Sequence, residues 1–226
     1  MSEVAPGVRA VRAGARLTLV LDRAEKRNAL TAEMLAGLAG AAEGAWAEGA
    51  RVLVLTGVGP VFSAGADLAQ VRGGTLATSP LWERLSGAVE GFPGLSVAAL
   101  NGTAAGGALG MVLACDLRVA VPGAELFYPV LKMGVMPQPS DPGRLAALAG
   151  PGMAARILLG GARIGSAEAQ AAGVLDRVDE DLSGAVDALA AGAEAADPDH
   201  LAALVAAVRR ARPGPAALQE GPAPRP

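Results

Sequence analysis

The sequence predicts an α/β fold built around a mainly parallel sheet. Two apolar strands are expected at 51–56 and 95–100, with a helix between them from about Ser79 to Glu90. This strand, helix, strand order implies parallel pairing with right-handed crossovers. An apolar helix at 107–115 and a strand at 117–121 then repeat the alternation.

The N-terminal part is expected to begin the sheet. Apolar runs at 8–11 and 17–21 are separated by the turn-prone pair Ala13-Gly14 and predict a hairpin. Thr31 is a candidate N-cap for a helix with Glu33 in its first turn, which ends at Gly49. The apolar stripe of that helix consists of Met34, Leu35, Leu38, Ala42 and Trp46.

The helix at 107–115 is apolar on every face, so it is expected inside the molecule. The segment 127–133 follows, and Asp141, which precedes Pro142, is the expected N-cap of the next helix. The remaining expected elements are a helix at 153–159, a helix at 167–172 capped by Ser166, and two final helices at 182–195 and 198–211.

Charge and composition exclude several classes of function. The net charge is −3, and Lys and Arg are scattered without interleaved aromatic residues, so no nucleic-acid partner is expected. No apolar run is long enough to span a membrane, and residues 1–14 lack the apolar segment of a signal peptide. We therefore expect no membrane partner and a cytoplasmic location.

The single cysteine and the single histidine carry no catalytic pattern. Cys115 lies in an apolar segment, where burial is expected, and it has no second cysteine for an intrachain disulfide. His200 is expected on a solvated face in the first turn of a helix. Neither a Ser-His-Asp nor a Cys-His mechanism is supported, and no metal site is expected.

Two glycine-bearing stretches carry the chemistry of this chain. They are PVFSAGADL at 60–68 and NGTAAGGALGMVLACD at 101–116. Each runs from an apolar strand into small residues at the start of an expected helix, which leaves backbone N–H groups open to one anionic oxygen. Together they predict an oxyanion hole. Either stretch alone also fits a tight turn or close helix packing, because glycine serves both.

Four stretches together resemble the crotonase superfamily, which includes enoyl-CoA hydratases and isomerases. They are LDRAEKRNAL at 21–30, PVFSAGADL at 60–68, the second glycine-bearing stretch extended to Ala120, and LLGGARIGSAEAQAAGVLDRV at 158–178. They stand in the family's order and at similar spacing.

The resemblance implies a crotonase-like spiral of repeated ββα units with an acyl-CoA site over residues 1–178. It also implies a C-terminal helical region at 179–212 that supports a homotrimer or a dimer of trimers. Residues 213–226 are rich in proline and are expected to be flexible. Acyl-CoA is the implied ligand, with coenzyme A as part of the substrate and no permanently bound cofactor.

The resemblance assigns roles to residues of this chain. The two donors to the thioester oxygen would be the N–H groups of Ala66 and Gly107. Arg23, Lys26 and Arg27 would lie near the nucleotide end of CoA, although three loop cations can also be merely solvated. The other expected substrate contacts are Ala64, Asp67, Leu68, Ala69 and Gly106.

Family hydratases carry a glutamate at each of two positions, which Gly110 and Val130 occupy here. A third position, which carries an aspartate in some isomerases, is Gln138. The candidates for an acid or base are then Asp141, ranked first, and Tyr128, ranked second. Lys132, Asp67 and Glu83 follow, with Glu83 expected to face solvent.

We therefore expect an acyl-CoA-binding enoyl-CoA hydratase/isomerase family protein that stabilises a thioester enolate without two-glutamate hydration. Two alternatives stay open. One is an isomerase or decarboxylase that needs a single acid, and the other is a subunit without catalysis that binds acyl-CoA or serves in assembly.

Overall fold

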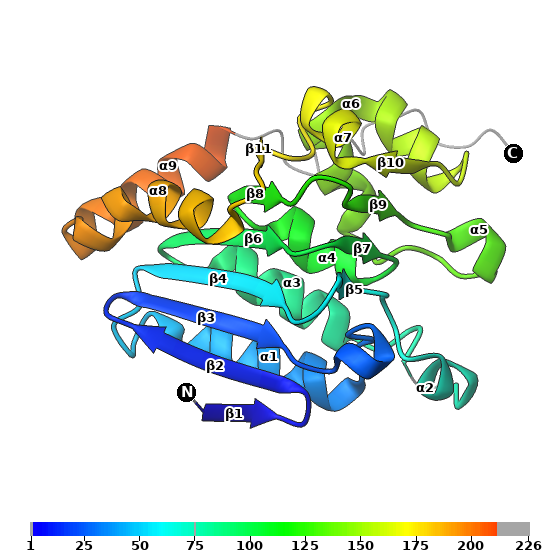
Figure 1. Ribbon diagram of the computed structural model, residues 1–226, viewed down its shortest axis with the longest axis horizontal. Helices are drawn as coiled ribbons and strands as arrows, with labels where there is room; N and C mark the ends of the chain where they lie inside the picture. The colour runs from blue at the N-terminus through cyan, green and yellow to red at the C-terminus, as the bar shows by residue number, and fades with distance from the viewer. Residues whose placement is uncertain (1, 75, 212–226) are drawn as a thin grey trace, which may run out of the picture.

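The chain winds so that successive strands alternate between a large sheet and a small one (Figure 1). A computed structural model describes residues 2–74 and 76–211. The large sheet has the order β1-β2-β3-β4-β6-β8-β11, and the small sheet has the order β10-β9-β7-β5. The large sheet is formed by β1 (Ser2–Ala5), β2 (Val8–Ala13), β3 (Arg16–Leu21), β4 (Val52–Gly57), β6 (Leu95–Leu100), β8 (Leu117–Ala120) and β11 (Arg177–Val178).

The small sheet lies beside the ends of the parallel strands and completes a repeated ββα pattern. Each of β4, β6 and β8 is followed by a strand of the small sheet and then by a helix, as the resemblance predicts. The pairing is antiparallel in the β2–β3 hairpin and parallel from β3 through β4, β6 and β8 to β11, which confirms the predicted alternation. The small sheet is formed by β5 (Val61–Ser63), β7 (Thr103–Ala105), β9 (Glu125–Phe127) and β10 (Arg163–Gly165).

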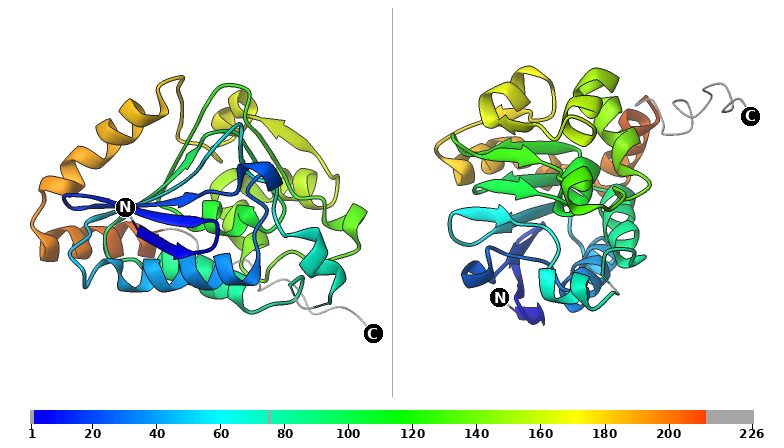
Figure 2. Two further views of the ribbon diagram at one scale, coloured as in Figure 1. Left: turned by 60° about the horizontal axis from the view of Figure 1, so that its bottom comes forward. Right: turned by 90° about the vertical axis from the view of Figure 1, so that its right-hand side faces the viewer.

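Helices cover both faces of the large sheet, and successive apolar side chains of β4 point alternately to these two faces. Leu53 and Leu55 point into the main core beneath α1 and α3, whereas Val52 and Val54 pack with the face of α8. The left view of Figure 2 shows α1 and α8 on opposite sides of the strands. The helices on the main-core side include α1 (Ala32–Ala45), α3 (Leu81–Gly91) and α4 (Ala108–Ala114), and the C-terminal pair is α8 (Leu182–Ala195) and α9 (Pro198–Ala211).

Local signals of the sequence hold in several of these helices. The hydroxyl of Thr31 accepts a hydrogen bond from the N–H of Met34, so Thr31 caps α1 as predicted. Every residue of α4 is buried, which confirms the interior position expected for a helix that is apolar all round. Cys115 is buried as well, and His200 is exposed.

Other expectations need correction. Several short elements were not expected from the local pattern: the strands β1, β7, β9, β10 and β11, the helices α2 (Leu68–Arg72) and α5 (Val130–Met133), and the 3-10 turn η1 (Ala24–Lys26). The helices expected from Asp141 and Met153 are joined in α6 (Asp141–Leu158), which bends at Gly150, where φ is +78°. Ser166 is the first residue of α7 (Ser166–Ala171), and Gly165 occupies the N-cap without a side-chain hydrogen bond.

Different helices lie at the two ends of the molecule. The helices α8 and α9 lie at one end, and α2 and α5 lie at the other (Figures 1 and 2).

The tail at 213–226 lies outside the described residues. Among the helices of residues 2–74 and 76–211, none combines the length and apolar character needed to cross a membrane.

Candidate active site

The two glycine-bearing loops meet at the end of the small sheet. They follow β5 and β7, which pair in parallel, so both loops leave the sheet at the carboxyl ends of neighbouring strands. Gly65 has a φ of +90°, and a Cβ there would lie 2.7 Å from the carbonyl oxygen of Ala105. Because a side chain at 65 has no space, glycine allows the backbones of the two loops to touch.

Hydrogen bonds on either side of Ala66 fix the direction of its own N–H. Leu30 donates its N–H to the oxygen of Gly65 and accepts from the N–H of Asp67. In such a parallel bridge, the residue between those two groups directs its N–H and C=O to the opposite side. The N–H of Ala66 is therefore turned away from Leu30.

The second loop is pinned in a similar way. The N–H of Gly106 donates to the oxygen of Phe127 at 3.0 Å, and Gly107 then precedes the first turn of α4. Throughout the described residues, neither the N–H of Ala66 nor that of Gly107 donates a hydrogen bond. Both residues are half-buried and line the same cavity. The loops thus bring two unpaired donors to one hollow.

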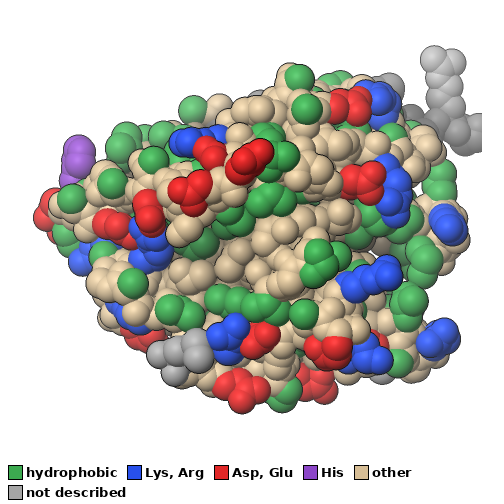
Figure 3. Space-filling view, viewed as in Figure 1, with side chains coloured by type: hydrophobic (Ala, Val, Ile, Leu, Met, Phe, Trp, Pro, Cys, Tyr) green, Lys and Arg blue, Asp and Glu red, His purple; other side chains and the backbone are tan. Residues whose placement is uncertain are grey.

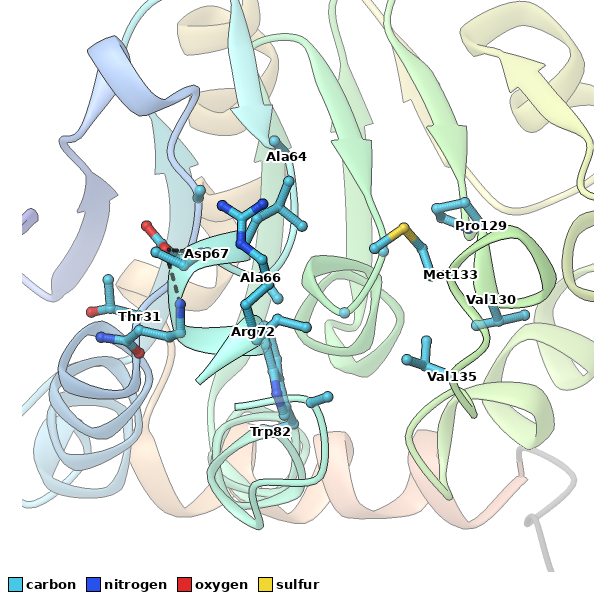
Figure 4. A pocket seen from close by; sticks show the side chains of 18 of the residues that line it. Thr31, Ala64, Ala66, Asp67, Arg72, Trp82, Pro129, Val130, Met133 and Val135 are labelled. Carbon is cyan, nitrogen blue, oxygen red and sulfur yellow. Dashed lines mark hydrogen bonds between the residues drawn. The ribbon is translucent and has the colours of Figure 1, made fainter. Parts of the chain in front are cut away.

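The cavity has a volume of about 810 Å³ and two chemically different walls. Figure 4 shows Ala64, Ala66 and Asp67 on one side, and Pro129, Val130, Met133 and Val135 on the other, with Trp82 below. All eight expected substrate contacts line this cavity: Arg23, Lys26, Arg27, Ala64, Asp67, Leu68, Ala69 and Gly106.

The cations at the cavity differ in how they are held. Arg23 is paired with the carboxylate of Asp67 at 2.6 Å and also donates to the oxygen of Ala29. The hydrogen bond from Arg23 keeps the pKa of Asp67 below its usual value, and Asp67 also caps α2. Lys26 and Arg27 are exposed and, in the part of the chain that the structure describes, form no ion pair. These two cations remain open to a ligand.

A phenol and a buried carboxylate form the inner acid–base pair. Tyr128 lines the cavity, and its hydroxyl donates to Oδ2 of Asp141 at 3.0 Å. Burial raises the pKa of Asp141 to about 7, against the smaller opposing effects of the Tyr128 hydrogen bond and of Arg144. Burial, and then the charge of Asp141, also raise the pKa of Tyr128. Burial therefore shifts both groups toward their neutral forms.

The helix-cap interpretation of Asp141 is wrong. Ser140 occupies the N-cap of α6, and Asp141 is the first helical residue, with its side chain directed to Tyr128 instead of to the helix N–H groups. The expectation that Glu83 faces solvent is wrong as well. Glu83 accepts hydrogen bonds from the N–H and the hydroxyl of Ser140 at 3.0 and 2.7 Å, and so ties α3 to the start of α6.

Asp141 also stands against Gly110. A Cβ at position 110 would lie only 2.9 Å from Oδ1 of Asp141, so the carboxylate fills the space of the missing side chain. Val130 and Gln138 line the cavity and contribute no carboxylate. Asp141, Gly110, Glu83 and Lys132 are not part of the cavity lining, so Tyr128 lies between Asp141 and the hollow.

Comparison with known proteins identifies the family. The model of the enoyl-CoA hydratase/isomerase family matches residues 14–220, which is nearly the whole chain. The chain belongs to the enoyl-CoA hydratase/isomerase family. It is accordingly a member of the crotonase superfamily.

Relatives of this family member span most of its length. A probable enoyl-CoA hydratase, EchA6 of Mycobacterium tuberculosis, is 36% identical over 166 residues, which cover 74% of this chain and 68% of the relative. The putative enoyl-CoA hydratase/isomerase YngF of Bacillus subtilis is 34% identical over 188 residues, covering 80% and 72%. A putative enoyl-CoA hydratase of Thermobifida fusca, solved in complex with CoA, superimposes with a TM-score of 0.82 at 27% identity, covering 91% of this chain and 85% of that one.

Several residues of this enoyl-CoA hydratase/isomerase family member escaped the sequence analysis. Asn28 is fully buried, and its side chain joins the loop of Arg23 to the oxygens of Val58 and Val61. Trp82 donates its indole N–H to the oxygen of Leu76 and forms the floor beneath Gly107. Asn28 bonds to residues 30 and 33 positions away, and Trp82 lies against a glycine of another loop. The lining residues missed are Ala29, Thr31, Gln70, Val71, Arg72, Ala77, Trp82, Pro129, Met133, Val135 and Met136.

Proposed function

We propose that this protein binds an acyl-CoA and stabilises the enolate of its thioester between the N–H groups of Ala66 and Gly107. The observation that carries the proposal is the convergence of two unpaired N–H groups, from loops in mutual contact, on one cavity. In enzymes with an oxyanion hole, one such donor stabilises the transition state by about 3–4 kcal/mol.

The nucleotide end of CoA fits the cationic side of the cavity. Lys26 and Arg27 are exposed there, and Arg72 of α2 lines the same side. Figure 3 shows Lys and Arg side chains over α2 and α5, with hydrophobic side chains between them. Phosphates would meet the cations, and the acyl chain would meet the apolar wall of Val130, Met133 and Val135.

The reaction that we propose needs one acid–base group and not two. Hydration requires one group to activate water and another to deliver a proton. Gly110 and Val130 stand where family hydratases carry glutamates, and neither side chain can activate water or deliver a proton. Double-bond migration or decarboxylation of an acyl-CoA is compatible with a single acid–base group near the two N–H donors.

A second candidate is a subunit that binds acyl-CoA without catalysis. The observation that favours it is the absence of a carboxylate at Gly110, Val130 and Gln138. We also propose a homotrimer or a dimer of trimers. Its support is the apolar surface of α9, where Leu204 and Val208 are half exposed. The mass of the protein in solution tests the assembly.

The proposal is tested by difference infrared spectroscopy of a bound acyl-CoA, with calorimetry to establish binding. Two donors to the thioester oxygen weaken its C=O bond, so the carbonyl band moves to lower wavenumber. A bound thioester whose band stays at its solution position contradicts the proposal. Turnover of enoyl, β-ketoacyl and malonyl-type thioesters then separates the enzyme from the binding subunit. Hydration of crotonyl-CoA at the rate of an ordinary hydratase would contradict the one-group reaction.

A further inference from the structure

Asp141 has the features of a proton-holding group, and its side chain does not cap its helix. Its side chain is 1% exposed. Oδ2 accepts the hydrogen bond of Tyr128, whereas Oδ1, among the described residues, has no hydrogen-bond donor and lies 3.9 Å from Nη1 of Arg144. A buried carboxylate oxygen without a donor is costly, so its persistence calls for a reason other than packing.

Tyr128 is placed to connect this carboxylate with a ligand. It lines the cavity, donates to Asp141, and accepts a long hydrogen bond of 3.4 Å from the N–H of Gln138. The phenol thus contacts a proton acceptor, Asp141, and also borders the open cavity. Proton transfer through such a chain needs only short shifts along existing hydrogen bonds.

The pair lies close to the second oxyanion donor. Oδ1 of Asp141 abuts the Cβ position of Gly110, which follows Gly107 by one turn of α4. One helical turn rises about 5 Å. Gly107 and Tyr128 line the same cavity, so a thioester whose carbonyl is held by Gly107 would share that cavity with the phenol.

We propose that Tyr128 and Asp141 act as one proton-transfer unit that moves the double bond of a β,γ-unsaturated acyl-CoA into conjugation. Tyr128 is the catalytic residue that exchanges protons with substrate carbon, and Asp141 is the positioning residue that holds the proton of the phenol. This inference rests on the proposed function, because the intermediate is the enolate held by Ala66 and Gly107.

The steps balance without a further reactant. The oxygen of Tyr128 takes a proton from the α-carbon as its own proton passes to Asp141. The electrons of the broken C–H bond form a C=C bond to the thioester carbon, and the carbonyl π electrons move to the oxygen. In the second step, the enolate collapses, the double bond shifts toward the thioester, and the γ-carbon takes a proton from Tyr128 while Asp141 returns one to the phenol.

Burial, modified by neighbouring groups, sets the pKa of Asp141 and so the pH at which the unit works. Nη1 of Arg144 lies 3.9 Å from Oδ1 of Asp141, while Arg144 also pairs with Glu90, and the negative charge of Glu83 in α3 acts on Asp141 as well. Burial and Glu83 raise the pKa of Asp141, and Tyr128 and Arg144 lower it, with a result of about 7. The carboxylate form, which starts the reaction, therefore becomes populated across the neutral range.

The test follows the exchange of α-protons of butyryl-CoA in D2O, and the isomerisation of 3-hexenoyl-CoA, by NMR. We expect wild-type exchange to rise with pH and level off above about 7. Tyr128→Phe should lose on the order of 10²-fold in exchange with unchanged CoA affinity. Asp141→Asn should lose a similar factor together with the rise near pH 7. Asp187→Asn, on exposed α8, is the matched control and should keep wild-type rates.

The outcomes separate this inference from the function on which it rests. Exchange at wild-type rate in Tyr128→Phe, or an unchanged pH profile in Asp141→Asn, overturns the proton-transfer unit. So does a wild-type protein that shifts the carbonyl band of bound acyl-CoA but exchanges no proton, and in that case the proposed function stands. A wild-type protein that shifts no band overturns the proposed function itself. Thermal unfolding of each variant confirms that it is folded.

Discussion

The carboxylate of Asp141 occupies the space of a side chain at Gly110. The two residues belong to different helices, α6 and α4, and a Cβ on Gly110 would approach Oδ1 of Asp141 to 2.9 Å. Each residue thus restricts the other: a side chain at 110 displaces the carboxylate, and the carboxylate at 141 requires glycine at 110.

Gly110→Ala should therefore destabilise the protein although alanine favours a helix. We expect a loss of about 1–3 kcal/mol, because the added methyl group overfills a buried contact. In an Asp141→Ala background, the contact is gone and the same substitution should be close to neutral. Urea unfolding of the four proteins of this cycle measures the coupling.

The matched control for this cycle is Gly87→Ala in α3, where a Cβ would meet no atom within 4 Å. That substitution should stabilise the protein by roughly 0.5–1 kcal/mol. Equal losses for Gly110→Ala in the presence and absence of Asp141 would show that the two side chains do not compete for one space.

Asp141→Asn should stabilise the protein at alkaline pH. The folded pKa of about 7 lies above the usual value near 4, so the folded state binds the proton more tightly. The contribution of Asp141 to stability is thus fully present below pH 4 and is lost as the pH rises to 7. At about 1.4 kcal/mol per pH unit between these values, asparagine should gain up to ~4 kcal/mol at pH 8.

The measurement is the free energy of unfolding of both proteins between pH 4 and pH 8. The difference should vanish near pH 4, where the aspartic acid is neutral and resembles asparagine. The exposed Asp187→Asn should stay within about 1 kcal/mol of wild type over the whole range. A constant difference between Asp141→Asn and wild type would mean that Asp141 does not change its charge on folding.

The order of the elements and the two loops could be predicted from the sequence because their signals are local. The apolar pattern of 95–100 lies within the strand that it specifies, and the predicted bounds 95–100, 182–195 and 198–211 are confirmed. The loops of Ala66 and Gly107 could be predicted because small residues after a strand are visible in one short stretch.

The environment of Asp141 could not be predicted, because it depends on three elements that meet only in the fold. An Asp-Pro pair is a common start of a helix, and this local signal favoured a cap. The true partner, Tyr128, is 13 residues away, and Glu83 is 57 residues from the Ser140 that it binds. No local sequence pattern encodes contacts over such distances, so the sequence did not predict that Asp141 is buried.

Removal of either open cation at the mouth of the cavity should weaken CoA binding. Lys26→Ala and Arg27→Ala should each lower the affinity by roughly 3- to 10-fold at low salt, since one charge contact near a surface contributes about 1 kcal/mol. The losses should shrink at 0.5 M salt, because ions screen exposed charges. Calorimetry with CoA at two salt concentrations measures both effects.

Arg210→Ala on α9 changes the net charge by the same amount far from the cavity and is the control for long-range attraction. Its affinity for CoA should equal that of wild type. Losses of the same size in Arg210→Ala and in the two loop variants would assign the effect to net charge and not to contact with phosphates.

Gly107→Pro and Gly107→Ala together isolate the contribution of one N–H group. Both substitutions add a Cβ that would meet the ring of Trp82 at 3.0 Å, so alanine controls for this contact with the floor of the cavity. Only proline removes the N–H, and the φ of −59° at this position suits its ring. The carbonyl band of a bound acyl-CoA should therefore keep most of its shift in Gly107→Ala and lose a large part of it in Gly107→Pro. If proton exchange is active, its rate should fall by about 10²–10³-fold in the proline variant relative to the alanine variant. Equal bands in the two variants would mean that the N–H of Gly107 does not reach the thioester oxygen.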